Sequence, residues 1–132
     1  MAIENTTAAW APRMLSVLRI MTGLLFLQHG TGKLLGFPPI DAPPLMSPGG
    51  IAGIFELVGG VLIVLGLLTR PVAFVLAGMM AVAYFWIHAP LGFFPIQNGG
   101  ELAIMYCFVF LYLMCAGPGP WSIDAKRGGK IG

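Results

Sequence analysis

The sequence predicts an all-α protein that crosses a membrane as an antiparallel bundle of four helices. Of its 132 residues, 58% are hydrophobic and only 9% are charged, whereas soluble domains carry about 25% charged residues. The apolar residues gather in four runs, and segments rich in proline and glycine separate these runs. The basic residues are scattered at the ends of the runs and form no patch, so the composition does not indicate a nucleic-acid partner. We therefore expect one transmembrane domain over residues 1–132, with the lipid bilayer as its main environment.

The first helix is expected over about residues 12–35, because Pro12 suits the first turn of a helix. Helical periodicity places five residues on one face, with His29 beside them: Arg19, Gly23, Phe26, Gly30 and Lys33. Arg19 lies close enough to the start of this helix for its side chain to extend back to water, and Lys33 can do the same at the other end.

The second helix, expected over about residues 50–68, carries a single charged residue, Glu56. Four glycines lie within about 60° of Glu56 on a helical wheel: Gly49, Gly53, Gly59 and Gly60. A charge in hydrocarbon costs a few kcal/mol or more unless it meets protein or water, and small residues let helices approach closely. This face is therefore expected to pack against another helix. The five prolines of the preceding segment, 36–49, indicate an ordered cap over one mouth of the bundle.

The third and fourth helices are expected over about residues 71–88 and 101–116. Pro71 starts the third, whose presumed inner face mixes small residues with Tyr84 and the terminal His88. Glu101 lies in the first turn of the fourth, where a carboxylate interacts favourably with the helix dipole. A Gly-Pro-Gly-Pro sequence ends this helix and leaves a basic tail over residues 117–132.

The distribution of basic residues predicts the orientation. If the four spans alternate in direction, six basic residues share the side of both termini: Arg13, Arg19, Arg70, Lys126, Arg127 and Lys130. The opposite side has only Lys33. Because cytoplasmic segments carry the excess of lysine and arginine, both termini and the tail are expected to be cytoplasmic.

The same alternation gathers polar residues in the non-cytoplasmic half of the bundle: Gln28, His29, Lys33, Glu56, His88, Gln97, Asn98 and Glu101. Glu56 and His29 each lie six residues from a helix end, at similar depth. We expect an outward-facing polar pocket beneath the two proline-rich loops. We also expect Glu56 to pair with His29 or Lys33, because an unpaired buried charge is costly.

Two interpretations stay open for most of these residues. Glu56 is either a structural partner in an ion pair or, with His29, a proton-handling catalytic acid. Lys33, Glu101, His88, Tyr84 and Arg19 are candidate ligand-binding residues, although each also has a structural explanation as a helix-end, belt or snorkelling residue. His29 and His88 without a third ligand do not favour haem or metal. Cys107 and Cys115 lie eight residues apart, too far for a disulfide within one helix.

The motifs as a set resemble the DoxX family of small bacterial membrane proteins. The resemblance rests on R-x-x-x-G-x-x-F-x-x-H-G-x-x-K (19–33), G-G-x-x-x-x-x-E-x-x-G-G (49–60), G-L-L-T-R-P, N-G-G-E (98–101) and G-P-G-x-W-S-I-D. It covers roughly residues 19–124 and implies a multi-pass, four-helix bundle in the bacterial inner membrane. Some relatives are subunits of quinone-linked or oxidative-stress complexes, whereas more distant ones act as chaperones or assembly factors. The resemblance assigns no catalytic residue.

Three functions are compatible with this sequence. The first is a redox-associated subunit that binds a quinone or a small sulfur or aromatic compound in the outward pocket. It would need a partner for electron transfer, because the sequence holds no cofactor motif of its own. The second is a non-catalytic assembly, chaperone or partner-binding protein that docks another membrane protein. The third is permeation of a small solute, for which a homo-oligomer would be needed. We rank the first function slightly ahead because of the family resemblance.

Overall fold

A computed structural model describes residues 1–128, and within that range every regular element is helical. The long elements are α1 (Ala2–Leu35), α2 (Pro48–Leu65), α3 (Thr69–Ala83) and α5 (Glu101–Ala116). A π-helical turn, η1 (Tyr84–His88), and a 3-10 turn, η2 (Ala89–Leu91), continue α3. Two short helices that the sequence analysis did not predict complete the set: α4 (Pro95–Asn98) and α6 (Ile123–Lys126).

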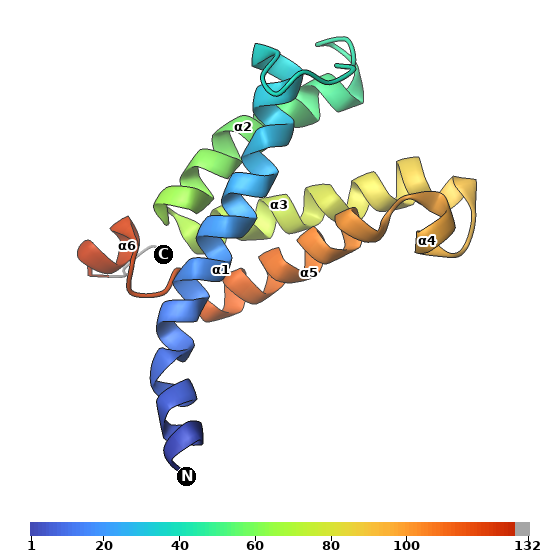
Figure 1. Cartoon of the computed structure of the whole chain (residues 1–132). Helices are drawn as coiled ribbons and strands as arrows, with labels where there is room; N and C mark the ends of the chain where they lie inside the picture. Colours follow the sequence, from blue (N-terminus) through green and yellow to red (C-terminus); the bar gives the residue numbers. More distant parts are fainter. Residues whose placement is uncertain (129–132) are drawn as a thin grey trace.

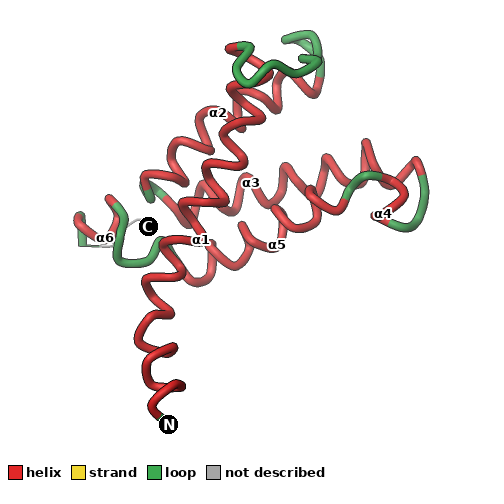
Figure 2. Tube along the Cα trace, viewed as in Figure 1, coloured by secondary structure: helices red, strands yellow, loops and turns green. Residues whose placement is uncertain are grey.

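The helices are arranged as two antiparallel hairpins rather than as one closed bundle. α1 packs along α2, and α3 packs along α5, whereas α1 and α5 contact each other only briefly. Figure 1 shows that the hairpins meet at one end and diverge toward their loops, which Figure 2 draws in green at the two tips. The all-helical prediction is confirmed, whereas the packing of the four helices as one bundle is not. Most of the packing lies within each pair, and the two pairs contact each other near one end.

Three helical stretches in the described chain are long and apolar enough to cross a membrane. These are α1, α2 and the continuous stretch from Thr69 to Leu91. α5 is apolar but has only 16 residues, which corresponds to about 24 Å of helix against a hydrocarbon core of about 30 Å. The fourth crossing and the cytoplasmic location of the termini therefore stay predictions.

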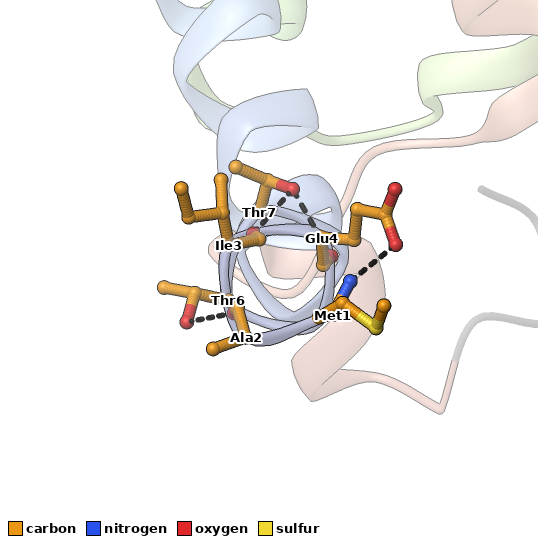
Figure 3. Close-up of polar contacts among 6 residues, drawn as sticks. All are labelled: Met1, Ala2, Ile3, Glu4, Thr6 and Thr7. Carbon is orange, nitrogen blue, oxygen red and sulfur yellow. Dashed lines mark hydrogen bonds and ion pairs between the residues drawn. The ribbon is translucent and has the colours of Figure 1, made fainter.

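The first helix begins ten residues earlier than predicted, at Ala2 instead of Pro12. Local polar contacts explain the difference (Figure 3). The amino group of Met1 pairs with Glu4, and the Thr6 hydroxyl donates to the Ala2 carbonyl at 2.9 Å. Glu4 in the first turn interacts favourably with the helix dipole and pairs with the terminal amino group, whereas the threonine hydroxyl adds a second donor to a carbonyl of the helix. Pro12 is accommodated inside the helix.

The boundaries of the next two helices also shift by a few residues. The Ser47 hydroxyl accepts a hydrogen bond from Gly50 N at 3.2 Å, so α2 begins at Pro48 rather than at residue 50. It ends at Leu65 instead of 68, because Gly66 adopts a left-handed conformation (φ 66°) that terminates the helix. α3 then starts at Thr69 rather than Pro71, and the α5 bounds agree with the prediction.

Two glycines bring the backbones of α1 and α2 into contact. A Cβ built on Gly30 would lie 2.7 Å from Leu57 Cα, and one on Gly60 would lie 2.8 Å from Leu27 Cα. These distances are too short for any side chain, so the close approach requires glycine at both positions. The hairpin α1–α2 is therefore held by backbone proximity along the face that carries Glu56.

An aromatic cluster joins the two hairpins near their meeting point. Phe26 of α1 makes edge-to-face contacts with Tyr106 and Phe110 of α5, with ring centroids 5.2 and 5.1 Å apart. Ile63, Leu76 and Leu113 are buried around it. Edge-to-face aromatic pairs add about 0.5–1.5 kcal/mol each to the gain from burial. This cluster positions α5 against α1 and forms the closed end of the space between the hairpins.

Residues 117–126, which the sequence places in the cytoplasmic tail, fold back onto the helices. The Asp124 carboxylate accepts hydrogen bonds from the backbone N–H groups of Leu68 and Thr69, both at 2.9 Å. Asp124 N in turn donates to the Gly66 carbonyl at 2.9 Å. The segment thus caps the start of α3 and covers the α2–α3 turn. Lys130, predicted in the same tail, lies outside the described residues.

Candidate functional site

The central feature of the candidate site is an ion pair between the two helices of the first hairpin. Lys33 Nζ of α1 donates to Glu56 Oε1 of α2 at 2.8 Å, and the Glu56 side chain is only 6% exposed. Gly53 makes room for the lysine, because a Cβ there would lie 3.1 Å from Lys33 Cβ. The structure therefore contains one of the two pairings expected for Glu56.

The second carboxylate oxygen of Glu56 has no hydrogen bond. Among the described residues, Glu56 Oε2 and Thr69 Oγ1 are the buried side-chain oxygens without a partner. Leaving a buried polar atom unsatisfied costs about 1–3 kcal/mol, and more when the group is charged. Thr69 lies at the start of α3, away from the polar residues around Glu56. Glu56 is therefore the unsatisfied group among those polar residues. Glu56 also lines a pocket, so a ligand there could supply the missing donor after a small movement of the side chain.

A pocket of about 920 Å³ is lined by residues of both hairpins. The two hairpins diverge toward their loops (Figure 1). The polar and aromatic lining of the pocket comes from both hairpins: His29, Lys33, Glu56, His88, Trp86 and Tyr106. The remaining lining is largely aliphatic. Pro48 and Gly49, the last two residues of the proline-rich segment 36–49, line the pocket, whereas residues 36–47 are not part of its lining. The pocket volume is in the range of small-molecule sites.

The mouth of the pocket is apolar. Several lining side chains are also strongly exposed, among them Phe55 at 47%, Val82 at 48% and Trp86 at 75%. These residues come from the outer parts of α2, α3 and η1. In a membrane-spanning chain such a rim faces lipid rather than water. The exposed part of the lining is therefore largely apolar.

His29 and Tyr106 form one wall of the pocket. Their rings meet edge to face with centroids 6.2 Å apart, and Tyr106 is buried. Sequence reasoning missed Tyr106. The available signal was a tyrosine inside the otherwise apolar run of α5, one and a half turns after Glu101.

His88 lies on the opposite hairpin, and one ring nitrogen is already engaged. His88 Nδ1 lies 3.0 Å from the backbone carbonyl of Asn98. A carbonyl only accepts hydrogen bonds, so Nδ1 carries the proton and, in the neutral ring, Nε2 keeps its lone pair. His88 therefore brings a hydrogen-bond acceptor to the pocket.

The buried Asn98 organises the loop that holds His88. Its side-chain amide donates to the Gly92 carbonyl at 2.9 Å and to the Tyr84 hydroxyl at 3.2 Å. Its side-chain oxygen accepts from Gly100 N at 2.8 Å. The Asn-Gly-Gly sequence thus closes the tip of the second hairpin and orients the histidine.

Two further candidate residues lie outside the pocket lining. Tyr84 stacks on His88, with ring centroids 6.4 Å apart, and so supports the histidine from behind. Glu101 is exposed at the first position of α5. The structure brings together His29, Lys33, Glu56 and His88 of the seven residues that the sequence singled out.

Arg19, the seventh candidate, belongs to a different structure. The expectation that its side chain extends to water is wrong, because Arg19 is 0% exposed. Its guanidinium donates to the carbonyls of Ile63 at 2.9 Å, Trp121 at 2.7 Å and Pro118. A contact to the Val64 carbonyl is longer, at 3.4 Å. The Ser16 hydroxyl accepts a hydrogen bond from Trp121 N at 3.1 Å. We call the set Ser16, Arg19 and Asp124 the junction clasp, since it binds residues 117–126 to α1, α2 and the start of α3.

Within residues 1–128, no group of three or more His, Cys, Asp or Glu side chains lies close enough to hold a metal ion. Cys107 and Cys115 are both free thiols.

Comparison with known proteins places this architecture among bacterial membrane proteins. A family model described as DoxX matches residues 14–89. An uncharacterized protein of Haemophilus influenzae is 42% identical over 92% of this chain and 96% of its own length. The inner membrane protein YqjF of Escherichia coli is 30% identical over 82% of this chain and 87% of its own. The putative oxidoreductase CatD of Bacillus subtilis is 26% identical over 87% of this chain and 91% of its own. No solved structure gives a significant match.

Proposed function

Because this chain belongs to the DoxX family of integral membrane proteins, we propose that it is a redox-associated inner-membrane subunit that binds a lipid-soluble ring compound of the quinone type in the pocket between its hairpins. The observation that carries this proposal is the buried and unsatisfied Glu56 Oε2 at the wall of a pocket of about 920 Å³. The proposed orientation places this pocket toward the outer side of the membrane, with both termini cytoplasmic.

The chemistry of the lining supports a ring compound that arrives through the bilayer. The exposed apolar rim, with Phe55 and Trp86, is compatible with lateral entry from lipid. Trp86 and Tyr106 offer aromatic surfaces against which a flat ring packs. Few of the lining residues are polar, which suits a molecule with an apolar body and a polar head. The printed name of the Bacillus subtilis relative, a putative oxidoreductase, agrees with a redox association.

Within this site Glu56 is the residue that exchanges a proton with the ligand, and Lys33 holds the carboxylate in place. The 2.8 Å contact fixes one oxygen and leaves the other free for the ligand. His29 is the second candidate for proton handling, because it lies on the same wall. Electrons would pass to or from a partner, since no cofactor motif occurs in the sequence.

The test is mass spectrometry of small molecules that remain bound after gentle purification, on the unaltered chain and on Glu56→Gln. The amide keeps the shape of the side chain and a hydrogen bond to Lys33 but cannot take up a proton. We expect the unaltered chain to retain a lipid-soluble ring compound and Glu56→Gln to lose at least about nine-tenths of it, as a lost charge-assisted hydrogen bond requires.

Glu101→Gln is the matched control, because it makes the same chemical change at an exposed acid outside the pocket. It should retain the compound as the unaltered chain does. If Glu56→Gln folds, is merely less stable and retains the compound fully, the ion pair is only a lock between helices, and the proposal is wrong.

A further inference from the structure

We propose that the pocket selects the reduced, hydroxyl-bearing form of its ring compound, a hydroquinone, over the corresponding quinone. This inference rests on the proposed function and adds the hydrogen-bonding character of the ligand. It follows from the unsatisfied groups that the two hairpins bring to the pocket.

The first observation is that the unsatisfied buried group is an acceptor. Glu56 Oε2 is buried without a partner, and Lys33 occupies Oε1 of the same carboxylate. An ionised carboxylate accepts hydrogen bonds and cannot donate them. A quinone carbonyl placed against it would bring lone pairs to lone pairs, whereas a hydroxyl group would satisfy it.

The second observation comes independently from the other hairpin. His88 Nδ1 is committed to the Asn98 carbonyl at 3.0 Å, so the nitrogen that remains in the neutral ring is an acceptor. Asn98 is itself buried and held by three further hydrogen bonds, which fixes this arrangement. The pocket is therefore lined by two residues that each keep an acceptor atom without a partner, Glu56 on α2 and His88 on η1, and these come from opposite hairpins.

A ring with hydroxyl groups at opposite ends matches two acceptors on opposite walls. Lys33 can still donate, but its charge is already balanced by Glu56, and its contact with Oε1 uses one of its protons. A quinone would satisfy Lys33 and leave both acceptors unpaired. A hydroquinone donates to both. The difference between the two forms is at least one charge-assisted hydrogen bond, which corresponds to about tenfold or more in affinity.

The experiment compares three probes with the same short alkyl chain: a hydroquinone, its quinone, and the hydroquinone dimethyl ether. Each is titrated under anaerobic conditions into the full chain in lipid nanodiscs, and its dissociation constant is measured. We expect the hydroquinone to bind about tenfold or more tightly than either of the others. The ether keeps the ring and its oxygens but donates no hydrogen bond, so it isolates the effect of donation.

In Glu56→Gln the preference for hydroquinone should fall to within about threefold, because the amide offers the ligand a donor as well as an acceptor. Glu101→Gln should keep the full preference. Equal or tighter binding of the quinone to the unaltered chain would overturn the inference while leaving the proposed function intact. Failure of all three probes to bind would overturn both. The comparison of probes on the unaltered chain stays decisive even if Glu56→Gln does not fold.

Discussion

Replacing Arg19 by lysine should strongly destabilise this protein, even though the substitution keeps the charge. Arg19 is 0% exposed and donates from three nitrogens to backbone carbonyls of α2 and of residues 118–121. The rigid guanidinium reaches these carbonyls at the same time, whereas the single ammonium of lysine is a point donor. At least two of these hydrogen bonds should be lost.

The size of the effect follows from those contacts. A hydrogen bond to a charged group contributes about 1.5–3 kcal/mol, so the loss of two lowers the free energy of unfolding by about 3 kcal/mol or more. For a chain of this size that corresponds to a fall in melting temperature on the order of 10 °C. Arg19→Met also removes the positive charge that lies near Asp124, so its melting temperature should be lower still.

The assay is thermal unfolding of the purified protein in detergent, followed by loss of the monodisperse peak. Arg13→Lys is the matched control, because Arg13 is exposed and contacts only the ring of Trp10, at 5.0 Å. It should shift the transition by no more than a few degrees. If Arg19→Lys and Arg13→Lys have the same melting temperature, the junction clasp does not hold the hairpins together, and our account of residues 117–126 is refuted.

Three other outcomes can be measured on the same preparation or in cells. Gly60→Leu should lower the melting temperature by several degrees, since a Cβ there would lie 2.8 Å from the backbone of α1. Gly78→Leu should leave the melting temperature unchanged, because a Cβ at Gly78 meets nothing within 4 Å. Equal melting temperatures for the two variants would contradict close packing of α1 on α2. Asp124→Asn should cost about 1–3 kcal/mol, because the amide has one oxygen for two backbone donors; an unchanged unfolding curve would speak against this cap. With the native cysteines replaced by serine, a cysteine at Ile40 should react with an impermeant maleimide in intact cells, and one at Lys126 only after permeabilisation. The reverse pattern would overturn the proposed orientation.

The helices themselves were largely predictable, because their signals are local. The apolar runs located all four long helices, and the bounds of α5 agree with the prediction. The errors are also local in origin. Pro12 was taken for a helix start, although proline is tolerated inside this helix, which begins at Ala2 and has Glu4 in its first turn. The left-handed Gly66 ended α2 three residues early.

The site was predictable where a residue's depth and helical face determine its neighbours. Glu56 and Lys33 lie on glycine-bearing faces of consecutive helices, so their pairing at 2.8 Å follows from spacing and from the cost of an isolated charge. The same reasoning from depth and helical face was applied to Arg19, yet the prediction for its side chain was wrong. Its hydrogen-bond acceptors lie in residues 118–121, about a hundred positions away, and no local pattern shows that this segment returns to α1.

The sequence alone therefore determined the helices, the membrane setting and the acid–base pair, because periodicity, hydropathy and the cost of buried charge act within one or two helices. Only the tertiary structure decided that the helices form two diverging hairpins with a pocket between them. It also decided that Tyr106 lines that pocket and that Asp124 and Arg19 close the opposite end. These facts depend on the angle between the hairpins and on where a loop folds back. Contacts between residues distant in the chain determine both features. The free energies of these contacts are small, and the contacts produce no periodic pattern in the sequence.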